Sequence, residues 1–377
     1  MTERDREVLI WLTAVPGIGP QTVSKVLQRL QNFSFQLEEV CENHDSFYKK
    51  ISLSDAQITA LKKFQLRFSP QNYLELLTEK DIDVLCWDEE KYPSLLKEIS
   101  SIPHVLYVKG PAESWQNLPI SVVGTRHLTS YGEEVTKVIS GELVDLGATI
   151  VSGFMYGADM EAHLTAIQKK GKTVGVLGYG FDYLPTNTTQ YPTQQFLEAG
   201  NTFVTEFAPF VAAHKGNFPV RNRIVAGMSH ATVVVEAAQK SGSLITAQYA
   251  LDFGRLVCAV PGPFTSLYSE GTKNLVNQGA KLVTTGLDVI SELRPSLETS
   301  VLNGSESEKI QRRKNGLLLV HEKLEREILE HLFQQSEYAE KLAEVLKIPI
   351  SALLIHLSML EVKGLIYQKG NKWWSYL

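Results

Sequence analysis

A strand–turn–helix pattern occurs twice in succession within residues 120–159, and it constrains the fold of this chain more than any other feature. The first copy, ISVVGTRHLTSYG, is an apolar β-branched run that stops at Gly124 and leads into an amphipathic segment. The second copy, ATIVSGFMYGADMEAH, has the same order. Tandem units of this kind predict parallel strands, whose carboxyl ends bind anions at glycine turns and helix N-termini. We therefore expect Arg126 and the Ser152–Gly153 turn to share one anion-binding rim.

Length and composition limit the proteins to which this rim can belong. The chain has 377 residues, of which 44% are hydrophobic and 21% charged, enough for two or three domains with real cores. Its first residues, MTERDREVLIW, are charged, and no run approaches the roughly 18 apolar residues of a membrane span, so we predict a cytoplasmic protein without a membrane partner. The net charge of −5 argues against non-specific coating of nucleic acid but permits a local basic strip.

The three cysteines give no sign of a disulfide framework or a zinc site. Cys41, Cys86 and Cys258 are odd in number and far apart, without CxxC spacing. We interpret them as buried thiols and predict no metal site.

Residues 1–75 have helical patterning and form the first predicted domain. Gly17 and Gly19 lie in a PGIG hairpin that lets backbone amides face outward at the start of the next helix. The segment resembles a helix-hairpin-helix (SAM-like) domain, which grips nucleic-acid phosphates through backbone N–H groups. Lys25 and Arg29 would add a basic face to that helix. The alternative is a simple αα-hairpin that needs glycine for its turn. Three further cations are expected on a solvated face: Lys62, Lys63 and Arg67.

Residues 76–295 alternate β-rich runs with helical segments. About six or seven parallel strands are expected, which predicts an α/β fold with an extended Rossmann-like, doubly wound, mostly parallel sheet. The turn at Gly124 is not G-x-G-x-x-G, and Gly171-Lys172-Thr173 precedes a strand and lacks the upstream P-loop glycine. We therefore predict no nucleotide cofactor. Asp159 and His163 could form a metal or acid–base pair, but a helix-capping aspartate and a partly buried histidine are favoured.

The segment FPVRNRIVAG carries the most concentrated cationic chemistry. Arg221, Asn222 and Arg223 are expected on a loop, where two guanidinium groups could clamp successive phosphates. The alternative for Arg223 is an intramolecular pair with Glu206 or Glu236.

Two later helix starts have anion-binding character. Ser241 and Ser243 supply hydroxyls and free N–H groups, and Lys273 begins a helix with a similar small-plus-cationic signature. No G-x-S-x-G elbow is present, so we predict no serine nucleophile.

The C-terminal part begins with a polar, non-periodic stretch at 296–317, which reads as a linker. Residues 318–377 contain three helical segments and a hairpin around Gly370-Asn371, which predict a winged-helix domain. Its third helix offers few basic or amide side chains, so a protein contact or intramolecular docking through Trp373 and Trp374 is favoured over base reading.

Taken together, these motifs resemble the DprA/Smf family of bacterial natural transformation. The segments VVGTR, SGFMYGAD, GKTVGVLGYGFD, FPVRNRIVAG, VVVEAAQKSGSLITA and GTKNLVNQGAK occur in the family's order over about residues 90–292. The resemblance implies a non-catalytic homodimer that binds single-stranded DNA, protects incoming DNA and loads the RecA recombinase. It also implies DNA contacts by Arg126, Arg221 and Arg223.

One position departs from the family's pattern. The family usually has S-G-x-A-R-G-x-D, and this chain has Tyr156 in place of the arginine. A tyrosine can stack on an unpaired base, so single-strand binding is expected to persist with a changed salt dependence.

The predicted DNA site combines these elements. Single strands are favoured over duplex because the crevice has tyrosines (Tyr156 and Tyr179) nearby and no groove-reading helix is evident. The alternative is a nucleotide-binding enzyme of the phosphoribohydrolase (lysine-decarboxylase-like) type with Glu236 as general base, although its P-G-G-x-G-T-x-x-E loop is missing. The predicted contacts are Gly124, Arg126, Ser152, Gly153, Tyr156, Lys172, Arg221, Asn222, Arg223, Ser241, Ser243 and Lys273, with Gly17 and Gly19 as accessory backbone contacts.

Overall fold

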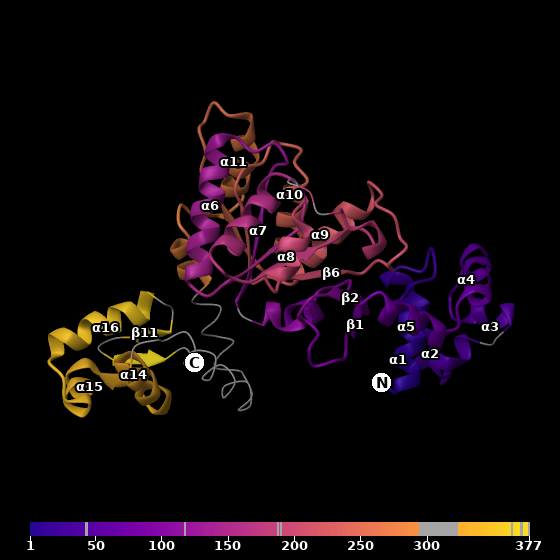
Figure 1. The fold of residues 1–377 in the computed structure, drawn as a ribbon, viewed down its shortest axis with the longest axis horizontal. Coiled ribbons are helices and arrows are strands. Elements are labelled where there is room, and N and C mark those ends of the chain that lie inside the picture. Colours follow the sequence, from indigo (N-terminus) through magenta and orange to yellow (C-terminus); the bar gives the residue numbers. More distant parts are fainter. Residues whose placement is uncertain are drawn as a thin grey trace. The chain divides into compact units, whose positions relative to one another are not determined.

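The fold was analysed in a computed structural model, shown in Figure 1. The structure describes residues 1–41, 44–116, 118–186, 188, 191–293, 323–362, 365–369 and 372–375. The chain forms two compact units, one of residues 1–144 and 148–282 and one of residues 145–147 and 283–377. The predicted linker at 296–317 lies outside the described residues.

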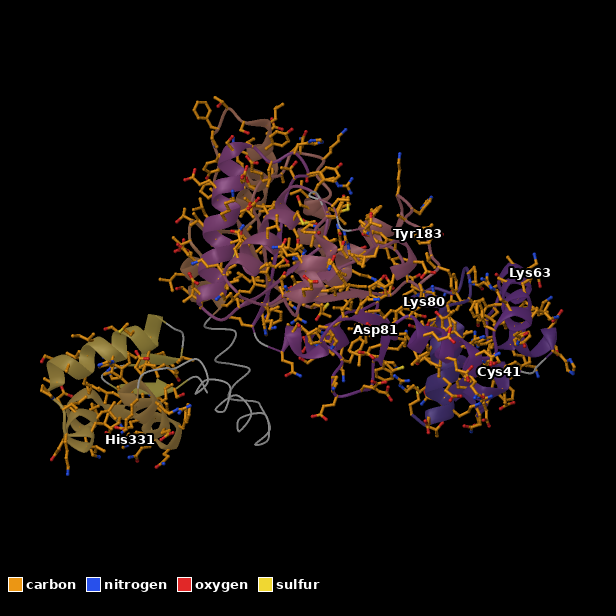
Figure 2. The ribbon with its side chains drawn as sticks, viewed as in Figure 1. Cys41, Lys63, Lys80, Asp81, Tyr183 and His331 are labelled. Atoms are coloured by element: carbon orange, nitrogen blue, oxygen red, sulfur yellow. The ribbon has the colours of Figure 1, made fainter. Side chains whose placement is uncertain are left out.

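The first unit begins with the predicted helices, and their ends follow the sequence signals. Side chains of Thr2, Ser54 and Ser69 cap three of these helices, and proline occupies the first position of α2 and α5, where its missing N–H costs nothing. Figure 2 shows Lys63 on the outer side of its helix, on the predicted solvated face. The helices are α1 (Glu3–Thr13), α2 (Pro20–Phe33), α3 (Asp45–Lys50), α4 (Asp55–Arg67) and α5 (Pro70–Glu79), with a 3₁₀ turn at Leu37–Val40.

A nine-stranded sheet follows, in the order β1-β2-β6-β5-β4-β3-β7-β8-β9. The strands from β6 to β9 in this order pair in parallel, as predicted, whereas β1 and β2 form an antiparallel edge that the sequence reading treated only as a lead-in. The strands are β1 (Asp83–Cys86), β2 (Val105–Lys109), β3 (Pro119–Val123), β4 (Thr149–Ser152), β5 (Thr173–Val176), β6 (Thr202–Thr205), β7 (Ala231–Val234), β8 (Leu256–Ala259) and β9 (Lys281–Leu282).

Helices cover the sheet between the strands. The central strands are buried along their whole length, as expected when helices cover both faces of a parallel sheet. Helices α9 and α10 pack against each other. The helices are α6 (Ser130–Asp145), α7 (Ala158–Gln168), α8 (Thr193–Glu198), α9 (Asn217–Gly227), α10 (Ser243–Asp252) and α11 (Glu270–Asn277), with 3₁₀ turns at Ser94–Glu98, Ala112–Trp115, Phe181–Tyr183 and Leu267–Ser269.

The strand order reverses at β3. Strands β4, β5 and β6 lie on one side of β3, and β7, β8 and β9 lie on the other. This is a topological switch point, where the turns after β3 and β7 diverge and leave a crevice at the carboxyl ends of the strands. The predicted doubly wound architecture is confirmed, and it fixes where a ligand would bind.

The second unit contains the three helices and the terminal hairpin that the sequence predicts. A short strand, β10, lies between the first two helices and extends the hairpin to a three-stranded antiparallel sheet in the order β10-β12-β11. The hairpin turn at Gly370-Asn371 lies outside the described residues, and the winged-helix assignment stays a prediction. The elements are α14 (Lys323–Gln334), β10 (Glu337–Tyr338), α15 (Ala339–Leu346), α16 (Ile350–Val362), β11 (Ile366–Lys369) and β12 (Lys372–Ser375).

Two further sequence expectations can be compared with the described residues. Cys86 and Cys258 are buried, as expected, whereas Cys41 is only partly buried. Within the described ranges no single helix is long and apolar enough to cross a membrane; α15 and α16 pass that test only as a pair, by length and composition, with a bend of 110° between them.

Candidate nucleic-acid interface

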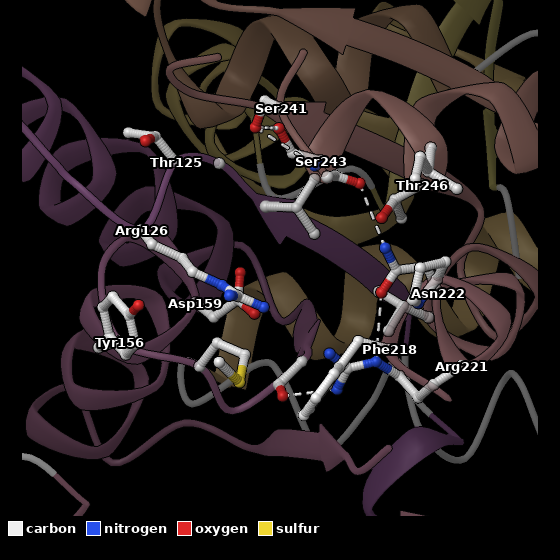
Figure 3. Close-up of a pocket in the computed structure, with 18 of the residues that line it drawn as sticks. Thr125, Arg126, Tyr156, Asp159, Phe218, Arg221, Asn222, Ser241, Ser243 and Thr246 are labelled. Carbon is white, nitrogen blue, oxygen red and sulfur yellow. Dashed lines mark hydrogen bonds between the residues drawn. The ribbon is translucent and has the colours of Figure 1, made fainter. Parts of the chain in front are cut away.

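A cavity of about 500 Å³ lies at the switch point of the sheet (Figure 3). The turns after β3, β4 and β7 meet there with the first turns of α9 and α10. The cavity therefore brings together part of the predicted rim, including Arg126 and Gly153. Its lining includes Gly124, Thr125, Arg126, Gly153, Met155, Tyr156, Asp159, Lys215, Phe218, Arg221, Asn222, Ser241, Gly242, Ser243 and Thr246.

Arg126 is an exposed cation that lines this cavity. Its guanidinium carbon lies 5.7 Å from the centre of the Tyr156 ring and 5.8 Å from that of Phe218, both within cation–π range. Among the described residues, no carboxylate or carbonyl accepts a hydrogen bond from it. The aromatic rings thus hold the guanidinium in place while its N–H donors stay available to an anion.

The turns after β3 and β4 are packed directly on each other. Gly157 has a φ of +89°, and a Cβ there would lie 2.7 Å from the Cα of Arg126, so only glycine fits. The backbone N–H of Ala158 donates to the carbonyl of Thr125 at 3.2 Å. Tyr156 and Arg126 are therefore held side by side by backbone contacts.

Arg221 lies on helix α9, not on a loop as the sequence predicted. The helix begins at Asn217. Pro219 therefore falls in its first turn, where proline is tolerated. Arg221 lines the cavity but is only 3% exposed. Its Nη1 donates to the carbonyl oxygens of Gly153, at 2.5 Å, and Val176, and its Nε donates to the Asn222 side chain at 3.2 Å.

Arg223 does not line the cavity, and its predicted alternative as an intramolecular pair is the arrangement found. Its Nη2 donates to Glu206 Oε2 at 2.5 Å, and both side chains are 5% exposed. Burial raises the pKa of Glu206, and the charge and hydrogen bond of Arg223 oppose that rise. The second named partner, Glu236, instead accepts from the backbone N–H and the hydroxyl of Thr129, at 3.0 and 2.7 Å.

Lys172 lies at the opposite edge of the sheet, away from the predicted rim. It directly precedes β5, so it stands at the amino end of that strand, and its Nζ donates to the carbonyl of Gly200 at 3.1 Å. In a parallel sheet the two ends of a strand face opposite edges. Lys273 is exposed on α11 and is not among the residues that line the cavity.

The predicted serines differ in their positions. Ser152 is fully buried, and its hydroxyl donates to the carbonyl of Val122 at 2.7 Å, so it supports the rim from beneath. Ser241 and Ser243 line the cavity, with their hydroxyls 2.8 Å apart. Asn222 also lines it and donates to the carbonyl of Gly242 at 3.2 Å.

Gly17 and Gly19 lie at a separate cavity of about 480 Å³. Gly17 has a φ of +82°, and Gly19 is the N-cap of α2, so the expected hairpin is present. Glu206 also lines this second cavity. The structure thus does not bring the two glycines together with the rim at the switch point.

Asp159 and His163 do not form a pair. Burial raises the pKa of Asp159, and the charge of Arg221 and the neighbouring polar groups of the turn at Gly153 and Met155 oppose the rise. Asp159 therefore binds the turn before α7 and is not the helix cap, which is a glycine. His163 is fully buried, 2.6 Å from the Thr173 hydroxyl, and burial lowers its pKa to about 3. The described residues hold no group of three or more His, Cys, Asp or Glu side chains suited to a metal ion.

Lys215 and Phe218 line the cavity but were not among the predicted contacts. Both lie between the end of β6 and the first turn of α9. The rule that ligands gather beyond the carboxyl ends of parallel strands, applied to β6, would have identified this segment.

Comparison with known proteins places the chain in a family. The family described as DNA recombination-mediator protein A matches residues 83–294. Protein Smf of Synechocystis is 34% identical over 301 residues, which cover 76% of this chain and 73% of that protein. DNA processing protein DprA of Streptococcus pneumoniae is 38% identical over 285 residues, covering 73% of this chain and 94% of that protein.

Two solved structures resemble the chain as well. The X-ray structure of S. pneumoniae DprA has a TM-score of 0.65 at 30% identity and covers 76% of this chain and 97% of that one. DNA processing protein A of Helicobacter pylori, whose structure is described as giving insight into its single-stranded DNA binding mode, has a TM-score of 0.50 at 26% identity, covering 56% and 95%. The family match over more than half of the sequence and these relatives agree: the chain belongs to the DNA recombination-mediator protein A family.

Proposed function

We propose that this protein binds single-stranded DNA in the cavity at the switch point of its sheet. Arg126 carries the proposal, because it is a cation without an acidic partner among the described residues and lies beside two aromatic rings. Lys215 adds a second exposed charge on another wall. Arginine donors suit phosphate oxygens, and aromatic faces stack on unpaired bases of any sequence.

The shape of the site supports a single strand over a duplex. A base must be unstacked and turned outward before it can lie on Tyr156 or Phe218, and paired bases in a duplex are not free to do so. The H. pylori relative, by its description, binds single-stranded DNA.

We extend the proposal, on family membership, to a role in DNA processing during natural transformation. In this role a cytoplasmic homodimer protects incoming DNA and loads the RecA recombinase onto it without catalysis. A phosphoribohydrolase activity is less favoured, because Glu236, its proposed base, accepts two hydrogen bonds from Thr129 and does not line the cavity.

The binding proposal is tested with a labelled dT oligonucleotide in a gel-shift series. Unlabelled single strands should compete well, and duplex DNA and nucleoside monophosphates poorly. Affinity should fall steeply between about 50 and 200 mM salt, because phosphate contacts release counterions. Equal competition by a nucleoside monophosphate, together with affinity that does not change with salt, would indicate a small-ligand site instead.

The RecA proposal needs a separate assay. RecA filaments are allowed to form on single strands coated with single-strand-binding protein, with and without this protein. We expect faster filament formation with the wild-type protein and no acceleration with Arg126→Glu. If the wild-type protein binds DNA but does not accelerate RecA, the loading role is rejected and DNA binding stands.

A further inference from the structure

Arg221 is 3% exposed, and three of its five N–H donors are used by neutral acceptors within the protein. Nη1 donates to two backbone carbonyls that end neighbouring strands, Gly153 after β4 and Val176 at the end of β5. Nε donates to the Asn222 side chain, and Nη2 lies close to the Asp159 carboxylate. A planar fork that spans two strand ends is a geometry that arginine fills and lysine does not.

The turn after β4 lies directly against the Arg221 guanidinium. A Cβ on Gly153 would lie 2.6 Å from both Arg221 Nη2 and Asp159 Oδ2, so the missing side chain lets both charged groups approach this backbone on the same side. The Asp159 carboxylate, at the start of α7, interacts with the Arg221 charge, which opposes the rise of its pKa on burial. The two opposite charges therefore meet at the turn, where only glycine leaves room for them.

The turn after β4 also fixes the exposed part of the cavity. It carries Tyr156, and Gly157 packs on the backbone of Thr125 and Arg126. A contiguous chain of contacts thus runs from Arg221 through Gly153 and Gly157 to Arg126. Figure 3 shows Arg221, Asp159, Arg126 and Tyr156 around the same cavity.

We infer that Arg221 is a positioning residue: it sets the turn after β4, and through it Tyr156 and Arg126, and makes no phosphate contact of its own. The inference rests on the proposed binding of single-stranded DNA. It differs from the role that sequence resemblance gave to this arginine.

Lysine at position 221 separates the two roles. Lys keeps the charge, so a phosphate contact would survive in Arg221→Lys with affinity for a dT oligonucleotide within about threefold of wild type. As a positioning residue, Arg221→Lys should lose roughly 10-fold or more, because the ammonium cannot hold both strand ends and the turn that carries Tyr156 shifts.

Arg223→Lys is the matched control, because Arg223 lies on the same helix, is equally buried and is paired with Glu206 outside the cavity. It should stay within about threefold of wild type. An equal loss in Arg223→Lys and Arg221→Lys would mean general damage to α9 and would overturn the inference.

A double variant provides the second test. Arg221→Met leaves the Asp159 carboxylate without its cation, and Asp159→Asn removes that charge. The double variant should regain most of the affinity that Arg221→Met loses, with thermal unfolding as the check on folding. If Asp159→Asn restores nothing, or if Arg221→Lys binds like wild type, Arg221 contacts phosphate. Failure of the wild-type protein to bind single strands would instead reject the proposed function.

Discussion

Two exposed cations at opposite edges of the same sheet have different environments. At the carboxyl edge, Arg126 lies between two aromatic rings and keeps its donors free among the described residues. At the amino edge, Lys172 donates to the carbonyl of Gly200 and makes no cation–π contact with the aromatic residues that the structure describes. Both residues are cations, so residue type does not explain the difference between their environments. Strand direction explains it, because the divergent turns and the helix N-termini lie at the carboxyl ends of the strands.

Arg126→Glu is expected to have the largest effect on DNA binding. It removes charge-assisted hydrogen bonds and adds repulsion against phosphate, so affinity for a dT oligonucleotide should fall roughly 100-fold or more at low salt. The side chain is exposed, so the thermal midpoint of unfolding should change little. Anisotropy titrations at constant salt measure the effect. Affinity that equals wild type would remove Arg126 from the site.

Tyr156→Ala tests whether the aromatic ring beside Arg126 stacks on a base. Base stacking contributes about 1–2 kcal/mol at such a surface, which corresponds to a loss of roughly 5- to 30-fold. The loss should be similar at low and high salt, because no charge is removed, and absent with an abasic oligonucleotide. A loss that is equally large with the abasic strand would contradict stacking.

Lys215→Glu and Lys172→Glu form a matched pair of exposed lysines at the two edges of the sheet. Lys215 lines the cavity, so its reversal should cost about 10-fold and lower the salt slope by roughly 0.7 or more.

Lys172→Glu is expected to have the smallest effect, within about twofold, since screening weakens charges beyond a Debye length of about 10 Å. The two variants are compared in one titration series with identical buffer. If Lys172→Glu weakens binding as much as Lys215→Glu, the DNA path extends to the amino edge, and the two edges do not differ in DNA binding.

The sheet was predictable because tandem strand–turn–helix units repeat a local pattern that parallel strands require. The antiparallel edge was not, because the segment between β1 and β2 contains Pro93 and Pro103, which interrupt any regular pattern. Strand direction at the edge depends on pairing with β6, a contact distant in sequence.

The site was predictable where turns follow strands. It was less predictable where a side chain can bind either a phosphate or an acceptor within the protein. Arg221 and Arg223 have the residue type of a phosphate clamp, yet buried carbonyls and carboxylates use the same donors. Sequence alone does not show which acceptor is nearer. Lys172 was misplaced for a simpler reason, since it precedes its strand.

The N-terminal helices meet the sheet through a buried pair of hydroxyls. The phenol of Tyr73 on α5 donates to that of Tyr107 on β2 at 3.1 Å, and Trp11, Phe64 and Phe210 belong to the same apolar cluster. A chain that began at residue 76 would uncover this aromatic layer and leave the Tyr107 hydroxyl without its partner. We therefore predict that a relative without these 75 residues has different side chains on this face of β2.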